Sequence, residues 1–222
     1  MFDQRTPYWI LFGGFTLTCI AGMVNAVGFL GAYHEAFSHL SGTTTFLSAD
    51  LVAGRYHQAL HAALLMLAFF GGATLSGLVI RDSHLKAGRR YGVALTMEAV
   101  LLLSAVPLLE ARQIWGSVCA AAACGLQNAM ATTYSGAIVR TTHMTGIVTD
   151  LGLALSHWLR RRPSRGGRVR LLSSLLLGFL VGSGIGAALF QRFGYSALHY
   201  PGGLALAIGV SHFVHRHFWH RR

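Results

Sequence analysis

The sequence predicts an all-α polytopic membrane protein with about six transmembrane helices. Only 11% of its 222 residues are charged, 53% are hydrophobic, and the mean hydropathy is +0.50. Soluble domains carry about 25% charged residues, so this composition is that of a chain that contacts lipid. Apolar stretches of about 20 residues, enough to cross a bilayer, recur along the chain. They leave no room for a soluble domain, and we expect residues 1–222 to form a single transmembrane domain.

Six apolar segments are predicted to cross the membrane. The first follows a poorly basic N-terminus, MFDQRTPYW, and is longer than the core of a signal peptide, so we expect it to be retained as a helix. The second and fifth are rich in glycine, the third carries one acidic residue, the fourth is nearly free of charge, and the sixth is the weakest because it includes Pro201. The predicted spans are residues 8–32, 59–80, 92–109, 115–139, 171–190 and 197–214.

The distribution of basic residues predicts the orientation of these spans. The formal net charge is +11, but of the 18 lysines and arginines only Arg55, Arg112 and Arg192 fall on one predicted side. Membrane proteins keep their basic loops in the cytoplasm, so both termini are predicted to be cytoplasmic. Topology and contact with anionic lipids of the bilayer then account for the charge. No nucleic-acid partner is expected, and a homo-oligomer is left open.

Two polar phrases, SHLSGTTTFLSADL at 38–51 and TTHMTGIVTDLG at 141–152, predict an internal repeat. Asn25 aligns with Asn128, and residues 39–42 align with 143–146 when one residue is inserted. Each phrase is followed by a glycine-rich span, FFGGATLSG in the first half and GFLVGSGIG in the second. Self-similarity of this kind indicates a repeated structural unit. Because each unit contains three spans, two units of about 8–110 and 115–216 would be inverted relative to each other, an arrangement typical of transporters.

A short helix is predicted after each phrase. Twelve helical residues extend about 18 Å, roughly half of the hydrocarbon core, and Ser41 and Thr145 are suitable N-cap residues. We expect half-helices or re-entrant turns whose N-termini point inward from opposite faces, where free backbone N–H groups favour an anion. Two alternatives remain, namely amphipathic interfacial helices that link spans and, for residues 43–80, one long span with a break.

Polar side chains in the spans and phrases are the candidate functional groups. Glu98 is an intramembrane carboxylate, which normally faces a cavity or a partner; the alternative is a protonated glutamate satisfied by a neighbouring helix. The amides within spans serve equally well as contacts between helices. The candidate substrate-binding residues are Asn25, His39, Ser41, Gly42, Thr43, Gln127, Asn128, His143, Thr145 and Gly146, and the candidate ion- or proton-coupling residues are Asp50, Glu98 and Asp150.

Other chemistries receive little support from the sequence. The three cysteines lie within predicted spans, which argues against a disulfide framework. His57 and His61 share a helix face, but no cysteine or carboxylate completes a ligand set, so no metal or cofactor is expected. Ser183 among glycines is explained by helix packing rather than by nucleophilic catalysis. No phosphate loop, dinucleotide fingerprint or zinc-peptidase motif occurs, and we expect no enzyme activity.

The repeated region resembles a known family. Residues 125–152, GLQNAMATTYSGAIVRTTHMTGIVTDLG, resemble the signature of the YoaK-like family of uncharacterised bacterial multi-pass membrane proteins, and residues 21–45, AGMVNAVGFLGAYHEAFSHLSGTTT, resemble its N-terminal motif. The similarity extends over essentially the whole chain and implies an inner-membrane protein with about six spans, without an established activity. The family often has aspartate in place of Asn25 and Thr-Gly-Asn in place of Ser41–Gly42–Thr43, so this chain departs from it in the first-half motif.

The leading functional hypothesis is a small-molecule or ion transporter, or small permease, of the bacterial inner membrane. Its site would lie between the two polar phrases, because an inverted repeat brings them in from opposite faces. A non-transporting membrane scaffold or sensor is the alternative, and an intramembrane hydrolase comes third. The sequence does not specify a substrate, a direction or a coupling ion.

Overall fold

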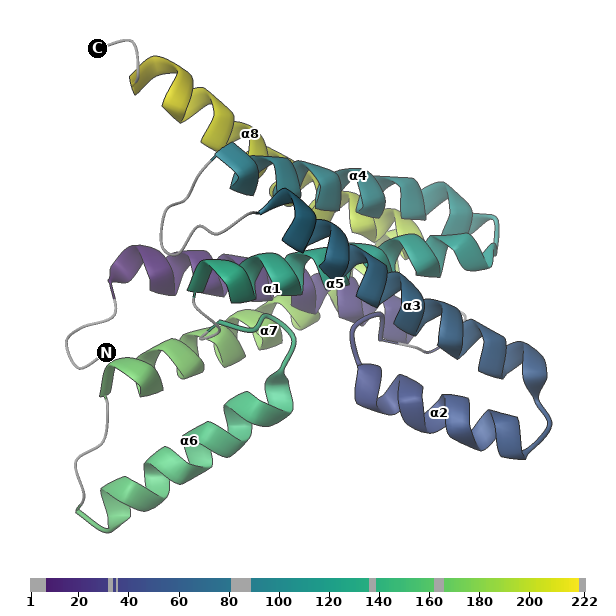
Figure 1. Ribbon diagram of the computed structural model, residues 1–222, viewed down its shortest axis with the longest axis horizontal. Helices are drawn as coiled ribbons and strands as arrows, with labels where there is room; N and C mark the ends of the chain where they lie inside the picture. Colours follow the sequence, from purple (N-terminus) through teal and green to yellow (C-terminus); the bar gives the residue numbers. More distant parts are fainter. Residues whose placement is uncertain are drawn as a thin grey trace.

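The computed structural model describes residues 7–31, 34, 36–80, 89–135, 139–161 and 166–219, and it shows a bundle of long helices flanked by two shorter ones (Figure 1). No strand occurs within these ranges, and the all-α prediction is confirmed. The helices are α1 (Tyr8–Leu30), α2 (Leu40–Val52), α3 (Tyr56–Val79), α4 (Arg89–Glu110), α5 (Ile114–Ser135), α6 (Met144–Leu159), α7 (Gly166–Phe193), the 3-10 helix η1 (Gly194–Leu198) and α8 (His199–Trp219).

Four helical segments of the described residues are long and apolar enough to cross a membrane. They are Tyr8–Leu30, Tyr56–Val79, Arg90–Glu110 and Gly166–His212. The last contains α7, η1 and most of α8, and Figure 1 shows α7 and α8 as two separate helices. α5 is as long as α4 but is not among the four. Its sequence, IWGSVCAAAACGLQNAMATTYS, contains the amides Gln127 and Asn128, and most of its central residues are buried by neighbouring helices.

Large apolar side chains cover the outside of the bundle. On α3, Leu67, Phe70 and Leu78 are each 65–70% exposed, and on α7 Leu177 and Leu180 are more than half exposed. A surface in contact with water rarely carries apolar residues in such continuous runs. The exposed faces of these helices are therefore the faces that lipid would cover, in agreement with the prediction of a membrane protein.

Glycines bring the backbones of α1 and α7 together. A Cβ added at Gly22 would collide with the backbone of Phe179, and one added at Gly182 would collide with the backbone of Cys19. The hydroxyl of Ser183 donates a hydrogen bond to the carbonyl of Gly22 over 3.3 Å. Small residues permit such a close approach of two helices in a membrane. Helix packing therefore explains the glycine-rich sequence of α7.

α5 lies along α3 through a matching contact. Gly125 of α5 faces the backbone of Phe69, and Gly72 of α3 faces the backbone of Ala122. Gly125 and Ala122 of α5 match Gly22 and Cys19 of α1, with the same separation along the chain for both pairs. Gly72 and Phe69 of α3 match Gly182 and Phe179 of α7 in the same way. The first helix of each half of the chain therefore packs on the glycine-rich helix of the other half.

α4 supplies one wall of the core. It packs against α5 and against α8, which runs antiparallel to it, since Gly202 lies beside Leu103 and Gly209 beside Thr96. Its buried positions recur every three or four residues, as expected for one face of a helix. This face consists of Tyr91, Ala94, Leu95, Glu98, Ala99, Leu102, Ala105, Val106 and Leu109, none of which is more than 5% exposed.

The two short helices lie beside the bundle and run to its opposite ends. In Figure 1, α2 and α6 each begin next to the middle of the bundle, and they extend outward in opposite directions. With 13 and 16 residues, their lengths are about 20 and 24 Å. α2 packs on α3, which follows it after a turn where Gly54 has φ +71°. α6 packs on α7 over a smaller area.

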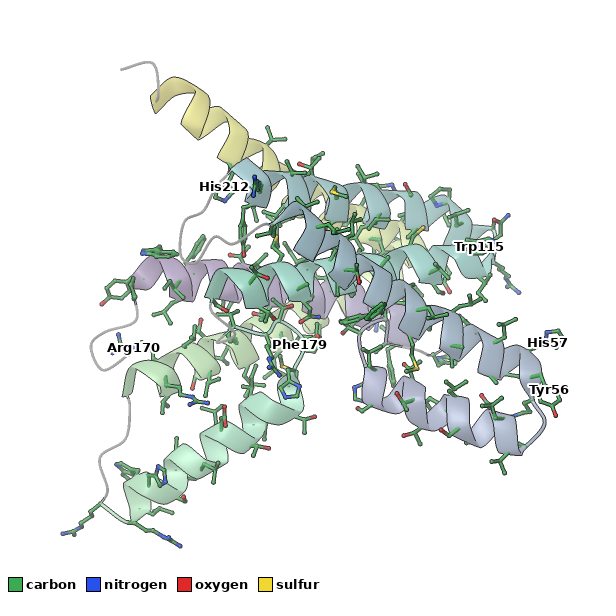
Figure 2. All side chains as sticks on the ribbon, in the orientation of Figure 1. Tyr56, His57, Trp115, Arg170, Phe179 and His212 are labelled. Carbon is green, nitrogen blue, oxygen red and sulfur yellow. The ribbon has the colours of Figure 1, made fainter. Side chains whose placement is uncertain are left out.

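The two ends of the bundle differ in their side chains. Figure 2 shows Arg170 and His212 at one end and Tyr56, His57 and Trp115 at the other. Arginines gather at the first end, at the start of α4, the end of α6 and the start of α7, where Arg90, Arg160, Arg161, Arg168 and Arg170 lie. The basic loops 81–88 and 162–165 that contribute to the predicted asymmetry lie outside the described residues.

Candidate functional site

Both short helices begin at a histidine with the same unusual backbone conformation. His39 precedes α2 with φ −87° and ψ 63°, and His143 precedes α6 with φ −88° and ψ 59°. The carbonyl of each histidine accepts the first helical hydrogen bond, from the N–H of Thr43 at 3.0 Å and of Ile147 at 3.1 Å. The histidines are thus the N-cap residues, and the prediction that Ser41 and Thr145 hold this place is wrong.

A glycine in the first turn of each short helix makes room for the histidine ring. A Cβ added at Gly42 would collide with the imidazole of His39, and one added at Gly146 would collide with the imidazole of His143. Each ring therefore lies over the helix backbone three residues later in the chain. The spacing His-x-x-Gly is common to both halves because the same turn is built twice, and we call these two segments, 39–42 and 143–146, the His-Gly turns.

An asparagine in a long helix ties down the segment before the first His-Gly turn. Asn25 of α1 accepts hydrogen bonds at Oδ1 from the backbone N–H of Ser38 at 3.1 Å and from the Ser38 hydroxyl at 2.9 Å. Its Nδ2 donates to the carbonyl of Ala21 at 2.8 Å. With both ends of its amide engaged within the protein, Asn25 holds the position of residue 38 and hence of the turn that follows.

The equivalent asparagine does the same in the second half. Asn128 of α5 accepts a hydrogen bond from the Thr141 hydroxyl at 3.1 Å and donates one to the Thr142 hydroxyl at 2.6 Å. Ser38, Thr141 and Thr142 were not among the predicted site residues, although each lies within one or two positions of a predicted histidine. The sequence signal that could have found them is the hydroxyl residue immediately before each histidine.

The remaining predicted residues of the two phrases differ in their exposure. Thr43 is buried, and its hydroxyl donates to the carbonyl of His39 at 3.2 Å. Ser41 and Thr145 are exposed, one position before Gly42 and Gly146. The two turns thus present a histidine ring, a hydroxyl side chain and the first N–H groups of a helix, a combination of donors suited to an anionic or carbonyl-bearing group.

The first predicted coupling carboxylate is neutralised locally. Asp50 at the end of α2 accepts a hydrogen bond from Nε of Arg55 at 2.7 Å and forms an ion pair with the same guanidinium. The backbone N–H of Arg55 also donates to the carbonyl of Asp50 at 2.8 Å. The side chain of Asp50 is 11% exposed. This pair fixes the turn between α2 and α3.

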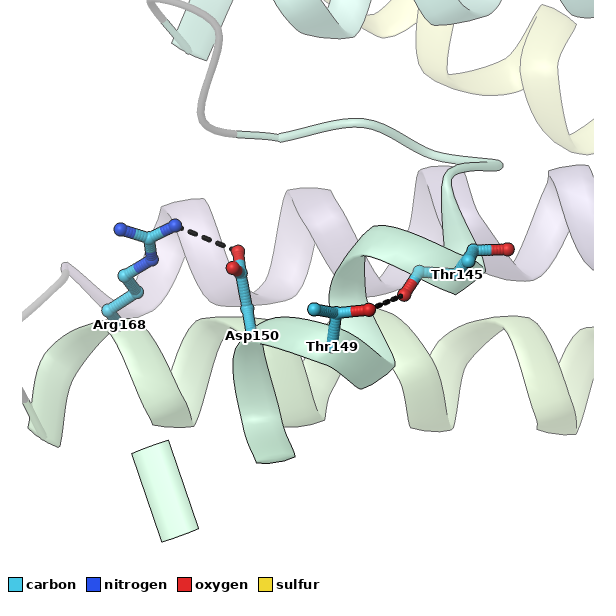
Figure 3. A network of polar contacts seen from close by, with 4 residues as sticks. All are labelled: Thr145, Thr149, Asp150 and Arg168. Carbon is cyan, nitrogen blue, oxygen red and sulfur yellow. Dashed lines mark hydrogen bonds and ion pairs between the residues drawn. The ribbon is translucent and has the colours of Figure 1, made fainter. Parts of the chain in front are cut away.

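The second predicted coupling carboxylate links α6 to α7. Figure 3 shows Arg168 of α7 reaching Asp150 of α6, where the two side chains form an ion pair of 2.8 Å, and Thr149 bonding to the carbonyl of Thr145. The side chains of Arg168 and Asp150 are 56% and 37% exposed. Asp150 comes four positions after its glycine and Asp50 eight after its own, so the two carboxylates occupy different places on their helices.

Arg168→Gln is expected to lower the free energy of unfolding by no more than about 1 kcal/mol, because exposed ion pairs contribute little. The difference should shrink at high salt. Thermal unfolding of the detergent-solubilised protein at low and high salt measures both effects, with Arg170→Gln on the same helix as the control. A loss of several kcal/mol that salt does not change would show that the pair is a main support of α6.

Two predicted polar residues lie in the core of the bundle rather than at the turns. Gln127 is 1% exposed, and its Nε2 donates to the carbonyl of Leu17 in α1 at 3.1 Å, which ties α5 to α1. Glu98 is buried on the inner face of α4, and its Oε2 has no hydrogen-bond partner within the described residues. The structure therefore brings the two asparagines to the His-Gly turns but keeps Gln127 and Glu98 inside.

The histidines and the serine considered for metal ligation and catalysis can be placed within the part of the chain that the structure describes. No three side chains of His, Cys, Asp or Glu within those ranges come together as a metal site would require. His57 is exposed and His61 buried, although they lie one turn apart. The hydroxyl of Ser183 is used in the α1–α7 contact.

Comparison with known proteins places the chain in a family. A family model with the description "Protein of unknown function (DUF1275)" matches residues 13–211. No curated protein and no solved structure matches the chain. The matched segment runs from α1 into α8 and includes both His-Gly turns and their asparagines. The chain therefore belongs to this family of unknown function, DUF1275.

Proposed function

We propose that the protein is a transporter or small permease of the bacterial inner membrane, in which the two His-Gly turns form the substrate site. One observation carries the proposal. Two helices, both too short to cross the hydrocarbon core of about 30 Å, begin at matched turns beside the middle of the bundle and run to its opposite ends. Broken helices whose N-termini meet near the midplane are how many transporters bind a substrate.

The proposal includes six spans arranged as two inverted repeats of about 8–110 and 115–216. It is supported by the matching glycine contacts of α1 with α7 and of α5 with α3. It is also supported by direction, since α1 begins at the end where the N-terminus is marked and α5 begins at the opposite end, near Trp115 (Figures 1 and 2). The spans would be α1, α3, α4, α5, α7 and α8, in line with the resemblance to YoaK-like membrane proteins.

The proposed substrate site contains groups from both halves. His39, Ser41 and Gly42 come from the phrase at 38–51, and His143, Thr145 and Gly146 come from the phrase at 141–152. Asn25 and Asn128 support them. Helix N-termini favour negative charge, so we infer a substrate with a carboxylate, phosphate or similar anionic group. Asp50, Glu98 and Asp150 are the candidates for coupling transport to an ion or a proton.

The arginines favour one orientation for the proposed protein. Those at the ends of α4, α6 and α7 lie at one end of the bundle, whereas Arg55, Arg112 and Arg192 lie in the turns or helix end at the other. By the positive-inside rule the arginine-rich end, where α1 begins and α8 ends, faces the cytoplasm. Arginines at this end would also contact anionic lipid headgroups.

A scaffold or sensor without transport is the alternative, and an intramembrane hydrolase is less supported because Ser183 serves the α1–α7 contact. A scaffold needs the same packing but no movement of the two short helices. The two functions therefore differ in whether water reaches the His-Gly turns from both sides of the membrane, which can be measured without knowing the substrate.

Thr145→Cys is expected to react with a membrane-impermeant maleimide added from either side of oriented vesicles. A transporter opens its site alternately to each side, so the thiol meets water from both. The reaction is followed by the mass shift of the protein in right-side-out and inside-out vesicles. Ser41→Cys in the opposite phrase should behave in the same way.

Ser156→Cys near the C-terminal end of α6 is the matched control, since it is two to three turns from the His-Gly turn and should react from one side only. The parent chain, with its three native cysteines, gives the background reaction. Labelling of Thr145→Cys and Ser41→Cys from a single side, or from neither, would contradict transport and favour the scaffold. A ligand-stabilisation screen of the solubilised protein at two pH values would then identify the substrate.

A further inference from the structure

Glu98 lies midway along α4 and is shielded from solvent on every side. The residue is 2% exposed, and Leu95 and Leu102, one turn to either side on the same face, are 2% and 0% exposed. Within the described residues, its Oε2 accepts no hydrogen bond, and no arginine, lysine or histidine forms an ion pair with it. An unpaired charge in such surroundings is strongly disfavoured. The group that belongs at this position is the neutral acid.

The other carboxylates of the described residues have partners. Asp50 is paired with Arg55 and Asp150 with Arg168. Glu110, at the far end of α4, accepts a hydrogen bond from the Ser196 hydroxyl at 2.7 Å. Of the three predicted coupling residues, Glu98 alone is therefore free to change its protonation state without breaking an ion pair.

The ionisable groups around Glu98 do not provide a counter-charge. Cys124 of α5 interacts electrostatically with the carboxyl, and it carries no positive charge. On α8, His212 lies against Tyr91, two turns away from Glu98, with the ring centroids 6.5 Å apart. The ionisable residues of the elements packed against α4, among the described side chains, are Tyr56, His57, His61, Cys119, Cys124, Tyr195, His199, Tyr200 and His212, and Cys19 lies on the neighbouring α1.

The same stretch of α5 that faces Glu98 also holds the second His-Gly turn. Nδ2 of Asn128 donates to the carbonyl of Cys124 at 3.3 Å and to the Thr142 hydroxyl at 2.6 Å. Cys124 therefore interacts electrostatically with Glu98, and its carbonyl accepts a hydrogen bond from the asparagine that ties α6. A charge that appears on Glu98 therefore acts on the residue of α5 whose carbonyl anchors Asn128.

A proton suits this position better than a metal ion. Hard cations such as sodium, magnesium or calcium need several oxygen ligands, whereas the residues beside Glu98 on the buried face of α4 are leucines and alanines. A proton needs a single carboxylate oxygen. No acidic residue occurs in α8, the counterpart of α4 in the second half of the chain. A carboxyl group at this position is therefore found in one half only.

We propose that Glu98 binds and releases a proton in the middle of the bundle, and that this proton is the coupling ion of transport. The coupling rests on the transport function proposed above; the proton binding does not. When the bundle opens to one side, Glu98 gives its proton to water as hydronium and becomes a carboxylate; when it opens to the other side, the carboxylate takes a proton from hydronium. The charged and neutral forms of Glu98 favour different positions of α6.

Infrared difference spectroscopy of the protein in lipid, between one alkaline and one acidic pH, tests the proton binding. The wild type should show a carboxylic-acid carbonyl band that titrates and shifts in deuterium oxide. Glu98→Gln should lack this band, whereas Glu110→Gln on the same helix should retain it. A Glu98→Gln spectrum with the same acid bands as the wild type overturns the proton site.

The coupling is tested by measuring the maleimide labelling rate of Thr145→Cys at several pH values. Each rate is divided by the rate of Ser156→Cys at the same pH, because this removes the pH dependence of the maleimide reaction itself. The ratio of the two rates should change with pH when Glu98 is unchanged, and also when Glu110→Gln is added as a control. It should be constant when Glu98→Gln is added. A ratio with unchanged pH dependence in Glu98→Gln overturns the coupling. Labelling from one side at every pH overturns transport and coupling together, and the infrared bands still decide whether Glu98 binds the proton.

Discussion

Replacing Gly72 with leucine is expected to destabilise the bundle strongly. A Cβ at this position would meet the backbone of Ala122 in α5, which cannot rotate away as the end of a side chain can. Overpacking of a core costs about 1–3 kcal/mol and sometimes more, and a clash with backbone belongs at the upper end. For a chain of this size, about 3 kcal/mol corresponds to a fall of roughly 6–12 °C in the midpoint of thermal unfolding.

The control is the neighbouring glycine. Gly71 is exposed, and a Cβ built there meets nothing within 4 Å, so Gly71→Leu should leave the midpoint within about 2 °C of the wild type, as expected for a surface change. Both variants are compared by thermal unfolding and by size-exclusion profile in detergent. Equal stability of the two would mean that α3 and α5 do not approach at Gly72.

The second half of the chain offers the same comparison. Gly182 of α7 faces the backbone of Cys19, and Gly184 faces open space. Gly182→Leu should therefore match Gly72→Leu in its effect, and Gly184→Leu should match Gly71→Leu. Agreement between the halves would support the inverted repeat. An accidental likeness of two glycine-rich sequences gives no reason for the two leucine substitutions to lower the unfolding midpoint equally.

The sequence was sufficient to locate the helices, but their ends could not be read from hydropathy. The predicted span 171–190 corresponds to α7, which begins at Gly166 and ends at Phe193. Hydropathy falls where arginines begin, whereas backbone hydrogen bonding continues as long as the helix geometry allows. The same reason explains why α3 starts at Tyr56 rather than at residue 59.

The caps of the short helices were predicted incorrectly for a physical reason. Ser and Thr favour N-cap positions because their hydroxyls bond to free N–H groups, which pointed to Ser41 and Thr145. In the structure neither histidine cap makes a side-chain hydrogen bond to its helix. The imidazole lies over the glycine three residues later instead, a tertiary arrangement that cap preferences do not describe.

The matched positions of the two halves could be read from the sequence, but the packing of α1 on α7 and of α5 on α3 could not. Matching asparagines, histidines and glycines indicate two copies of one unit without specifying which helix packs on which. Likewise, the sequence identified Glu98, Asp50 and Asp150 as one class of candidate. Only the placement of arginines in three dimensions separates the two paired aspartates from the unpaired glutamate.

Asn128→Leu is expected to release α6 from the bundle while leaving the rest of the fold in place. The change keeps a side chain of similar size but removes the bonds to Thr141 and Thr142. The loss of a buried hydrogen-bond partner costs about 1–3 kcal/mol, and each 1.4 kcal/mol is about a tenfold change in an equilibrium constant. Hydrogen exchange of the amides in α6 should therefore accelerate about fivefold to more than a hundredfold.

Asn25→Leu is the matched variant, since Asn25 holds Ser38 before α2 in the same way. It should accelerate exchange in α2 and leave α6 unchanged, whereas Asn128→Leu should do the opposite. Local opening measured by exchange reports each segment separately, so this crossed result would separate two independent tethers from a general loosening of the bundle. Equal acceleration of both helices in either variant would mean that the asparagines support the core and do not control the individual short helices.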